Sequence, residues 1–559
     1  MKTLLVTVVL LCGATTVVRA QGTAGTPPRG FSLPARASGE IVMTGETYKA
    51  AGIDARRPNQ AGRISMSPQL TLFGSFSVGL NLLVSTEGSQ FRQNISQFGI
   101  SPRYKWATFH VGDFSQNYSS YTVQGSRIRG GGVDLRPGIF RFSVQGGRSQ
   151  RVVSGGAGNQ AFRRNLYAGY VGIGREQSSF VDLIVSSAKD DPTSLDSALQ
   201  DTLLLDTIPV ALRPRYDTRP QENLVFGTRG QLSLFGRRFV LAGEGAVAVI
   251  TRDVEAPPAD PSSVGGGGAI SDAIPLTLAS SGDYAFKLDG TVNLGAAGLK
   301  GGYEYVGAGY TSLGLAYVIN DRRAYNFGGN VRFLQNRISV QGQYQHQNDN
   351  LIGQKASTTK RDAMMASLSV LVSRNVTATL TGMNSLIGND AAVDTFVVDN
   401  RSLALTANTA VQTAVAGMRT TVSVAYAFQR TADANIITRI PEITVHNLST
   451  SVQLALSKAV SITPSISYAV TNTEGGERQS NVHAGFRGQG RFGNLRPSVS
   501  FSQTYNNGRA VTAATGQLGY ALPWESRLSL QGRHSRYAAV GNRPAFQESF
   551  LTLSLARSF

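Results

Sequence analysis

Apolar and polar residues alternate along this chain, most clearly from about residue 220 to the end. In residues 323–335, Tyr325 and Phe327 fall on one face of an extended chain and Asn326 falls on the other. A period of two with one apolar face predicts β-strands that each turn one side toward an apolar environment. The same pattern marks residues 284–294, 338–345, 460–470, 495–505 and 527–533.

The connections between these strands alternate in length. Tight turns on one rim and longer loops on the other are typical of a transmembrane barrel, whereas a soluble sandwich has no such alternation. We therefore expect an all-β fold: a large closed antiparallel transmembrane β-barrel of about 24–26 strands, with short periplasmic turns and long external loops. The short connections are centred on Gly236, Asn336, Arg374, Lys458, Gly493 and Trp524, and the longer ones span residues 253–282, 348–360, 431–441 and 537–545.

Composition supports this class of fold. The chain is 41% hydrophobic and 16% charged, with a mean hydropathy of −0.09. It is too polar for a helical membrane protein and too poor in charge for an ordinary soluble enzyme. Beyond residue 20, no stretch approaches the length of apolar sequence that a membrane-spanning helix needs.

The first 20 residues predict a cleaved signal peptide, with a basic Lys2, an apolar stretch and a small Ala20 at the cleavage site. The alternative is an uncleaved anchor helix, but residues 4–11 are far shorter than the ~20 residues needed to span a bilayer. Residues 21–36 predict a short periplasmic leader, and residues 37–559 the barrel. Cys12, the one cysteine of the sequence, lies in the signal, so we expect no disulfide and no Cys-ligated metal.

The last ten residues alternate between Leu551, Leu553 and Leu555 on one face and small polar residues on the other, and the chain ends in Phe559. This segment resembles the terminal strand of bacterial outer-membrane β-barrel proteins, in which a final aromatic residue is read by the barrel-insertion machinery. Arg557 departs from that pattern, and we expect it to extend its charge toward the periplasmic headgroups. The resemblance implies export to the outer membrane of a Gram-negative-type bacterium, with Phe559 as insertion signal.

The formal net charge is +18, and the bases are spread along the whole chain. A charged side chain facing hydrocarbon costs roughly 2–4 kcal/mol at the midplane, so charges on the strands are expected to face inward. More bases than acids then line the lumen, which favours anions; alternatively, some arginines pair with acids and brace the wall. The predicted lumen bases are Arg141, Arg229, Lys287, Lys300, Arg332, Arg419, Arg487, Arg496, Arg527 and Arg533, and the predicted lumen acids are Glu244, Asp289 and Glu304.

A barrel this wide would be an open hole unless loops fill it. The two longest loops, residues 190–222 and 253–282, are the expected fillers. The first contains Asp190, Asp191, Asp196, Asp201 and Asp206, but their spacing does not match an EF-hand loop, so no metal site is expected there.

No motif predicts catalysis or a cofactor. The five histidines are scattered without metal-ligand spacing, and we expect only His483 to face inward. Residues 488–493 satisfy a GxGxxG pattern, but they end a strand in a tight turn instead of opening a helix. We therefore expect no enzyme, no cofactor, no metal and no nucleic-acid partner.

Two functions remain open. The first is a porin-like channel for passive or facilitated passage of small hydrophilic solutes, anions included. The second is a loop-plugged barrel that acts as an anchor, an adhesin or a component of an export assembly. Outer-membrane lipid, lipopolysaccharide and the barrel-insertion machinery are the expected partners in both.

Overall fold

The structure is a computed structural model that describes residues 35–86, 96–153, 160–195, 218–259, 276–433, 435, 441–506, 508–541 and 543–559. The predicted signal peptide and nearly all of the predicted leader lie outside the described residues and stay predictions. The first strand begins at Ala35, so strand structure includes the last two residues of the predicted leader.

The described residues form 28 β-strands and two short 3₁₀ helices, η1 (Pro192–Ser194) and η5 (Asp394–Phe396). Among these residues, no helix has the length and apolar character needed to cross a membrane. The strands are β1 (Ala35–Ser38), β2 (Glu40–Ala51), β3 (Gln60–Met66), β4 (Gln69–Leu72), β5 (Phe76–Ser85), β6 (Gln97–Tyr104), β7 (Ala107–Phe114), β8 (Ile128–Leu135), β9 (Phe140–Gln150), β10 (Arg163–Gly174), β11 (Phe180–Asp191), β12 (Glu222–Leu234), β13 (Phe239–Thr251), β14 (Ser280–Asn293), β15 (Ala297–Val306), β16 (Arg322–Phe333), β17 (Ile338–Asn348), β18 (Thr359–Ser373), β19 (Val376–Asn389), β20 (Asp399–Val415), β21 (Met418–Asp433), β22 (Ile443–Ala455), β23 (Val460–Thr473), β24 (Gln479–Gly490), β25 (Leu495–Asn506), β26 (Arg509–Leu522), β27 (Ser526–Tyr537) and β28 (Phe546–Ser558).

These 28 elements make a barrel of 26 strands, because two barrel strands are each broken in the middle. β3 and β4 both pair with β5 and are separated by Ser67 and Pro68, and proline has no N–H to donate to the ladder. On the neighbouring barrel strand, β1 pairs with β4 and β2 pairs with β3, and β1 and β2 meet at Gly39. Gly39 has a φ of 147°, and a Cβ there would lie 2.6 Å from Pro68 Cα, so this bend requires glycine.

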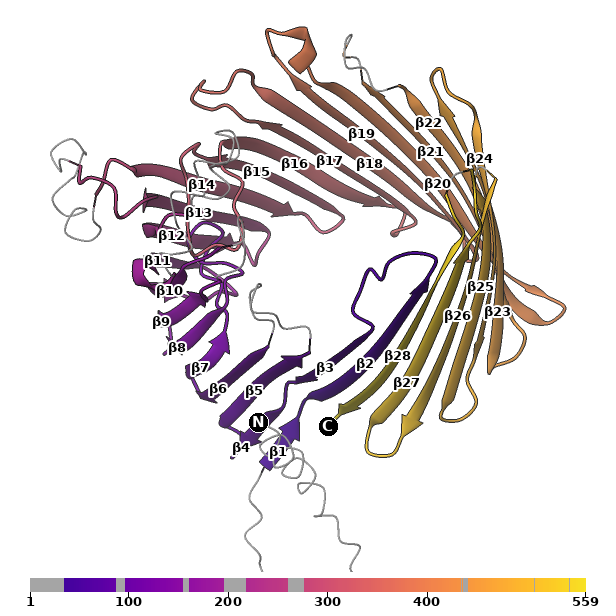
Figure 1. The fold of residues 1–559 in the computed structure, drawn as a ribbon, viewed down its shortest axis with the longest axis horizontal. Helices are drawn as coiled ribbons and strands as arrows, with labels where there is room; N and C mark the ends of the chain where they lie inside the picture. Colours follow the sequence, from indigo (N-terminus) through magenta and orange to yellow (C-terminus); the bar gives the residue numbers. More distant parts are fainter. Residues whose placement is uncertain are drawn as a thin grey trace, which may run out of the picture.

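Each strand pairs antiparallel with its neighbours, and the ring closes between β2 and β28 (Figure 1). In the closing pair, Met43 lies opposite Leu555, and the amide of Gly39 donates to the carbonyl of Phe559 at 2.8 Å. The predicted closed antiparallel barrel is therefore confirmed, and the upper of the two predicted strand numbers is correct.

The connections alternate in length as the sequence predicts. On one rim, which we call the short-turn rim, strands are joined by two to five residues, as in the turns 235–238 and 374–375. The other rim, the long-loop rim, carries longer connections, although β25 ends at Asn506 and β26 already begins at Arg509 there. Both Ala35 and Phe559 lie on the short-turn side.

The outer face of the barrel is apolar. Leu551, Leu553 and Leu555 are 38–50% exposed, and the register places them beside Leu528 and Leu530 of β27. Large apolar side chains left exposed around a closed barrel match the lipid-facing band of a transmembrane barrel.

Candidate functional site

The pairing register assigns every strand residue to the inner or the outer face. Residues opposite one another on neighbouring strands share a face, so the outer face of β28 can be followed around the ring. All ten predicted lumen bases, and also Glu244, Asp289 and Glu304, lie on the face opposite the outer apolar band. The structure gives their position; their effect on solutes stays a prediction.

Two segments fold from the long-loop rim onto the inner wall, and we call residues 115–127 and 307–321 the inner plug (Figure 1). The Tyr310 hydroxyl donates to the carbonyl of Tyr121 at 2.5 Å, and the Ser312 hydroxyl donates to the carbonyl of Thr122 at 2.7 Å. Tyr310 is fully buried. The two segments therefore form one packed unit.

The inner plug packs against the wall between β8 and β15. Tyr118 packs with Ile128 and Leu166, and Tyr121 packs with Val225 and Val306. Sequence reasoning missed this plug because it assigned the filling role to the longest loops. Residues 196–217 and 260–275 of those loops lie outside the described residues, so their filling role stays a prediction.

Carboxylates of the wall hold the plug by hydrogen bonds. The amide of Ser120 donates to Glu244 at 2.7 Å, and the hydroxyl of Tyr121 donates to Glu304 at 3.0 Å. Burial and the nearby Glu304 carboxylate raise the pKa of Tyr121 above its ordinary value, which keeps the phenol a donor. Arg322 also pairs with Glu304, at 2.6 Å.

Beneath the plug, two arginines share one buried carboxylate. Arg141 donates to Asp182 at 2.7 and 3.0 Å, and Arg229 donates to the same carboxylate at 2.9 Å. Arg141 lies over the Phe180 ring, with its guanidinium carbon 4.5 Å from the centroid. The Arg229 guanidinium also reaches the carbonyl of Asn117, at 3.4 Å, which ties this network to the plug.

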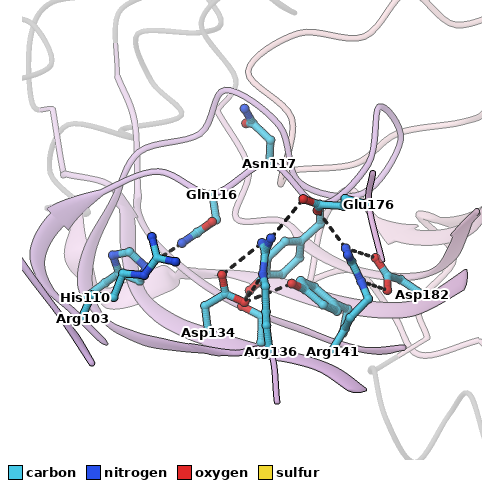
Figure 2. A network of polar contacts seen from close by, with 12 residues as sticks. Arg103, His110, Gln116, Asn117, Asp134, Arg136, Arg141, Glu176 and Asp182 are labelled. Atoms are coloured by element: carbon cyan, nitrogen blue, oxygen red, sulfur yellow. Dashed lines mark hydrogen bonds and ion pairs between the residues drawn. The ribbon is translucent and has the colours of Figure 1, made fainter. Parts of the chain in front are cut away.

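The network continues to the short-turn rim. Glu176 accepts from Arg141 at 2.8 Å and from Arg136 at 3.0 Å, and Arg136 also pairs with Asp134 at 3.2 Å (Figure 2). Burial raises the pKa of the Glu176 carboxyl, but the hydrogen bond from Arg141 and the charge of Arg136 outweigh it and lower the pKa below its ordinary value. Three arginines and three carboxylates thus neutralise one another.

The ten predicted bases therefore divide into two groups. Arg141 and Arg229 belong to the network, and Lys287 pairs with Asp289 at 2.9 Å, so these three brace the wall as the alternative interpretation expects. Of the part of the chain that the structure describes, no carboxylate pairs with any of the other seven, and all seven are exposed. They are Lys300, Arg332, Arg419, Arg487, Arg496, Arg527 and Arg533.

The seven bases lie on the inner face from β15 to β27, mostly beyond the strands that the plug covers. We call the inner face of β16 to β27 the bare wall. Asp433, at the long-loop end of β21, is the one carboxylate that the described strands contribute to it. Here the register aligns Arg487, Ser500, Thr515 and Arg533 in one row across four strands. With a strand spacing of ~4.8 Å, the ends of this row are about 14 Å apart.

The histidines differ from the prediction in one respect. His483 faces inward as expected and contacts Thr504 at 2.9 Å, but His110 also lies on the inner face. His110 lies 2.7 Å from Gln116 of the plug, so the prediction that His483 alone faces inward is wrong. Among the described residues, no cluster of three metal-ligating side chains occurs.

Comparisons with known proteins found similar structures but no similar sequences. No family model and no curated protein matches the chain. Structures that resemble it are the outer membrane protein OpdK from Pseudomonas aeruginosa (11% identity, 61% of this chain and 94% of that one, TM-score 0.31) and the ferric citrate transporter FecA (9% identity, 93% and 78%, TM-score 0.39). OmpT, an outer membrane protein of Vibrio cholerae, is similar at a TM-score of 0.27, with 8% identity over 61% of this chain and 92% of that one. TM-scores this low support no conclusion about the function of this chain.

Proposed function

We propose that this protein is an outer-membrane channel for small hydrophilic solutes and that it favours anions. The observation that carries the proposal is the bare wall, where six of the predicted bases are exposed and have no carboxylate partner among the described residues; Lys300 on the neighbouring β15 is a seventh. Fixed positive charge along a water-filled lumen raises the local concentration of anions and lowers that of cations.

The dimensions of the barrel support a channel. With 26 strands spaced by ~4.8 Å and tilted by ~40°, the barrel is about 50 Å across. The inner plug is a layer of chain against one part of the wall, between β8 and β15, and such a layer is about 10 Å thick. A layer of that thickness does not span a lumen of that width.

The charge distribution supports a preference for anions. Six of the seven unpaired bases lie within four residues of a short turn, so the positive potential is strongest toward that mouth; Arg533 alone lies in the middle of its strand. Between the bases, hydroxyl groups such as those of Ser500 and Thr515 supply neutral hydrogen-bonding partners that suit hydrated solutes.

A loop-plugged anchor or export component is the second candidate. The inner plug favours it, because buried tyrosines and charge-assisted hydrogen bonds fix the plug to the wall. In that case, the plug and the long loops together would close the lumen, and the protein would conduct no ions without a partner.

Single-channel conductance separates the two candidates. The refolded barrel is placed in a planar bilayer, and the reversal potential is measured across a salt gradient. We expect stepwise conductance with an anion-selective reversal potential. Charge reversal of Arg487, Arg496 and Arg527 to glutamate should shift that potential toward cation selectivity, while Arg401→Glu, on the outer face, should leave it unchanged. A correctly folded barrel that stays silent contradicts the channel.

The proposal also includes two partners of the barrel. Lipopolysaccharide contacts the long-loop rim, and the barrel-insertion machinery recognises Phe559. Deletion of Phe559 should lower the fraction of chain that reaches the outer membrane, which fractionation of the cell envelope would measure.

A further inference from the structure

We propose that the short-turn rim carries a collar that binds the phosphate headgroups of anionic phospholipids in the inner leaflet of the membrane. This inference rests on the proposed membrane embedding. It concerns the outside of the rim, and of the bases named below only Arg136 also belongs to the inner charge network.

The first observation is an excess of bases in the short turns. Nine exposed bases occur in these turns against two acids, Glu176 and Glu525. Arg136 pairs with Glu176, whereas the other eight have no carboxylate partner within the described part of the chain. The nine are Lys105, Arg136, Arg175, Arg237, Arg238, Arg337, Arg374, Lys458 and Arg491.

The long-loop rim has the opposite arrangement. Several bases there pair with acids: Arg401 with Asp399 at 2.9 Å, and Arg430 with Glu442 at 2.7 Å. Lys189 likewise pairs with Glu222 at 2.8 Å. In the described residues of the long loops, nine bases stand against ten acids, so a net excess of bases is a property of the short-turn rim.

The second observation is that the same turns expose large apolar side chains. Phe235 is 79% exposed and Trp524 is 74% exposed. An aromatic or aliphatic side chain at a turn tip is unfavourable in water but is stable at a bilayer interface. The exposed apolar residues of the short turns are Phe73, Trp106, Ile139, Phe235, Leu294, Leu334, Leu456, Phe492 and Trp524.

The two kinds of residue occur together and encircle the barrel. Six of the short turns carry both a base and an exposed apolar residue, and they are spread from the turn at residues 105–106 to the turn at 491–494. A protein partner would contact one sector of the rim, whereas a leaflet contacts the whole circumference. The ring therefore favours a lipid surface over an acidic protein.

Arg557 adds an outer-face base at the same level. The register places it on the lipid side of β28, beside Ser526, and the next residue, Ser558, donates its amide to the carbonyl of Glu525 in the short turn. Its Nε is buried and has no hydrogen-bond partner within the described structure. A lipid phosphate at this level would supply an acceptor.

The chain contains its own reporters of this collar. Its two tryptophans, Trp106 and Trp524, both lie in short turns. Brominated lipids quench tryptophan fluorescence on contact, so the full barrel can be reconstituted in neutral phosphatidylcholine containing either brominated phosphatidylglycerol or brominated phosphatidylcholine. We expect the anionic lipid to bind near the tryptophans about fivefold more strongly than the neutral lipid.

Two matched variants test the cause. The first variant replaces four bases of the short turns: Lys105→Gln, Arg237→Gln, Arg337→Gln and Arg491→Gln. It should bind anionic and neutral lipid about equally near the tryptophans. The control removes four exposed bases at the long-loop rim, Lys360→Gln, Arg478→Gln, Arg536→Gln and Arg543→Gln, and should keep the full preference. All eight positions are exposed, so both variants should fold, and the heat-dependent gel mobility of the barrel checks this.

Three results would overturn the collar: equal quenching by both lipids in the parent protein, the same loss of preference in the control, or quenching of both tryptophans by aqueous iodide instead of lipid. The third result would point to an acidic periplasmic protein. Conductance of the same preparation is measured in parallel. A barrel that conducts but shows no lipid preference overturns the collar alone, whereas a silent barrel overturns the channel.

Discussion

Asp182 is the residue on which the inner charge network depends. It is fully buried and accepts hydrogen bonds from both Arg141 and Arg229. A buried carboxylate that serves two guanidiniums leaves both of them uncompensated when it is removed. The sequence did not single out Asp182, because a carboxylate in an alternating strand gives no sign of which arginines will meet it across neighbouring strands.

Replacing Asp182 with asparagine should therefore destabilise the barrel strongly. Breaking a buried ion pair costs about 3–5 kcal/mol, and urea unfolding in lipid vesicles would measure the change. The control is Asp399→Asn, which breaks the exposed Asp399–Arg401 pair and should cost less than about 1 kcal/mol. Equal effects of the two substitutions would contradict the role given to Asp182.

A second prediction at this scale concerns pH. Asp321, at the end of the inner plug, accepts from the amides of Asn350 and Leu351 and from Lys355. Burial raises the pKa of Asp321, but the bond from Lys355 and the amide bonds outweigh it and hold the pKa below its ordinary value. The contact thus contributes stability above the unfolded value of about 3.9 and loses it as pH falls through the lower folded value.

Hydrogen exchange of residues 349–358 tests this sign. After correction for the intrinsic rate, the Asn350 and Leu351 amides should stay protected from pH 7 to about 4 and lose protection below that. Lys355→Gln should move the loss to higher pH. Protection that does not change with pH would show that Asp321 does not hold this loop.

Among the elements, the inner plug shows how far sequence reasoning reaches. Strand alternation and turn length predicted the strands, because each strand follows a local rule of period two. The plug follows no local rule: Tyr118 and Tyr121 belong to a loop of ordinary length, and they become buried only through contacts with strands distant in sequence. Tyr118 packs with Leu166, 48 residues away, and Tyr121 contacts Glu304, 183 residues away. The lumen bases could be predicted from the sequence because hydrocarbon excludes charge. Which acids pair with them could not be predicted, because that depends on the register between neighbouring strands.

Shortening the plug should widen the channel. Deletion of residues 118–123 removes the contacts to Glu304 and Glu244 and one layer of chain from the wall. We expect single-channel conductance to rise by tens of per cent instead of severalfold, because the plug lines one sector of a wide lumen. An unchanged conductance would place the narrowest point of the pathway elsewhere.

At the scale of the whole molecule, the lumen has two unlike sides. One side is covered by the plug and its charges are balanced, and the other is bare and basic. Because a barrel about 50 Å across encloses a lumen wider than the Debye length of about 10 Å at 0.1 M salt, the bare wall influences only solutes that pass near it.

Anion selectivity should therefore depend strongly on salt. We expect a clear anion-selective reversal potential at 0.01–0.1 M ionic strength and its loss near 1 M, where the Debye length is about 3 Å. Selectivity that persists at 1 M would indicate a narrow charged constriction in place of a wide basic wall. The same bilayer recordings supply this measurement.

The pairing of β2 with β28 also dictates an order of assembly. The Tyr48 hydroxyl donates to Glu548 at 2.6 Å across a sequence separation of 500 residues. Until these strands meet, the growing sheet has two open edges whose unpaired N–H and C=O groups can recruit any other strand. Closure is then the last and slowest event, since it joins the most distant segments of the chain. Whatever escorts this protein to its membrane must shield both edges until the seam between β2 and β28 has formed.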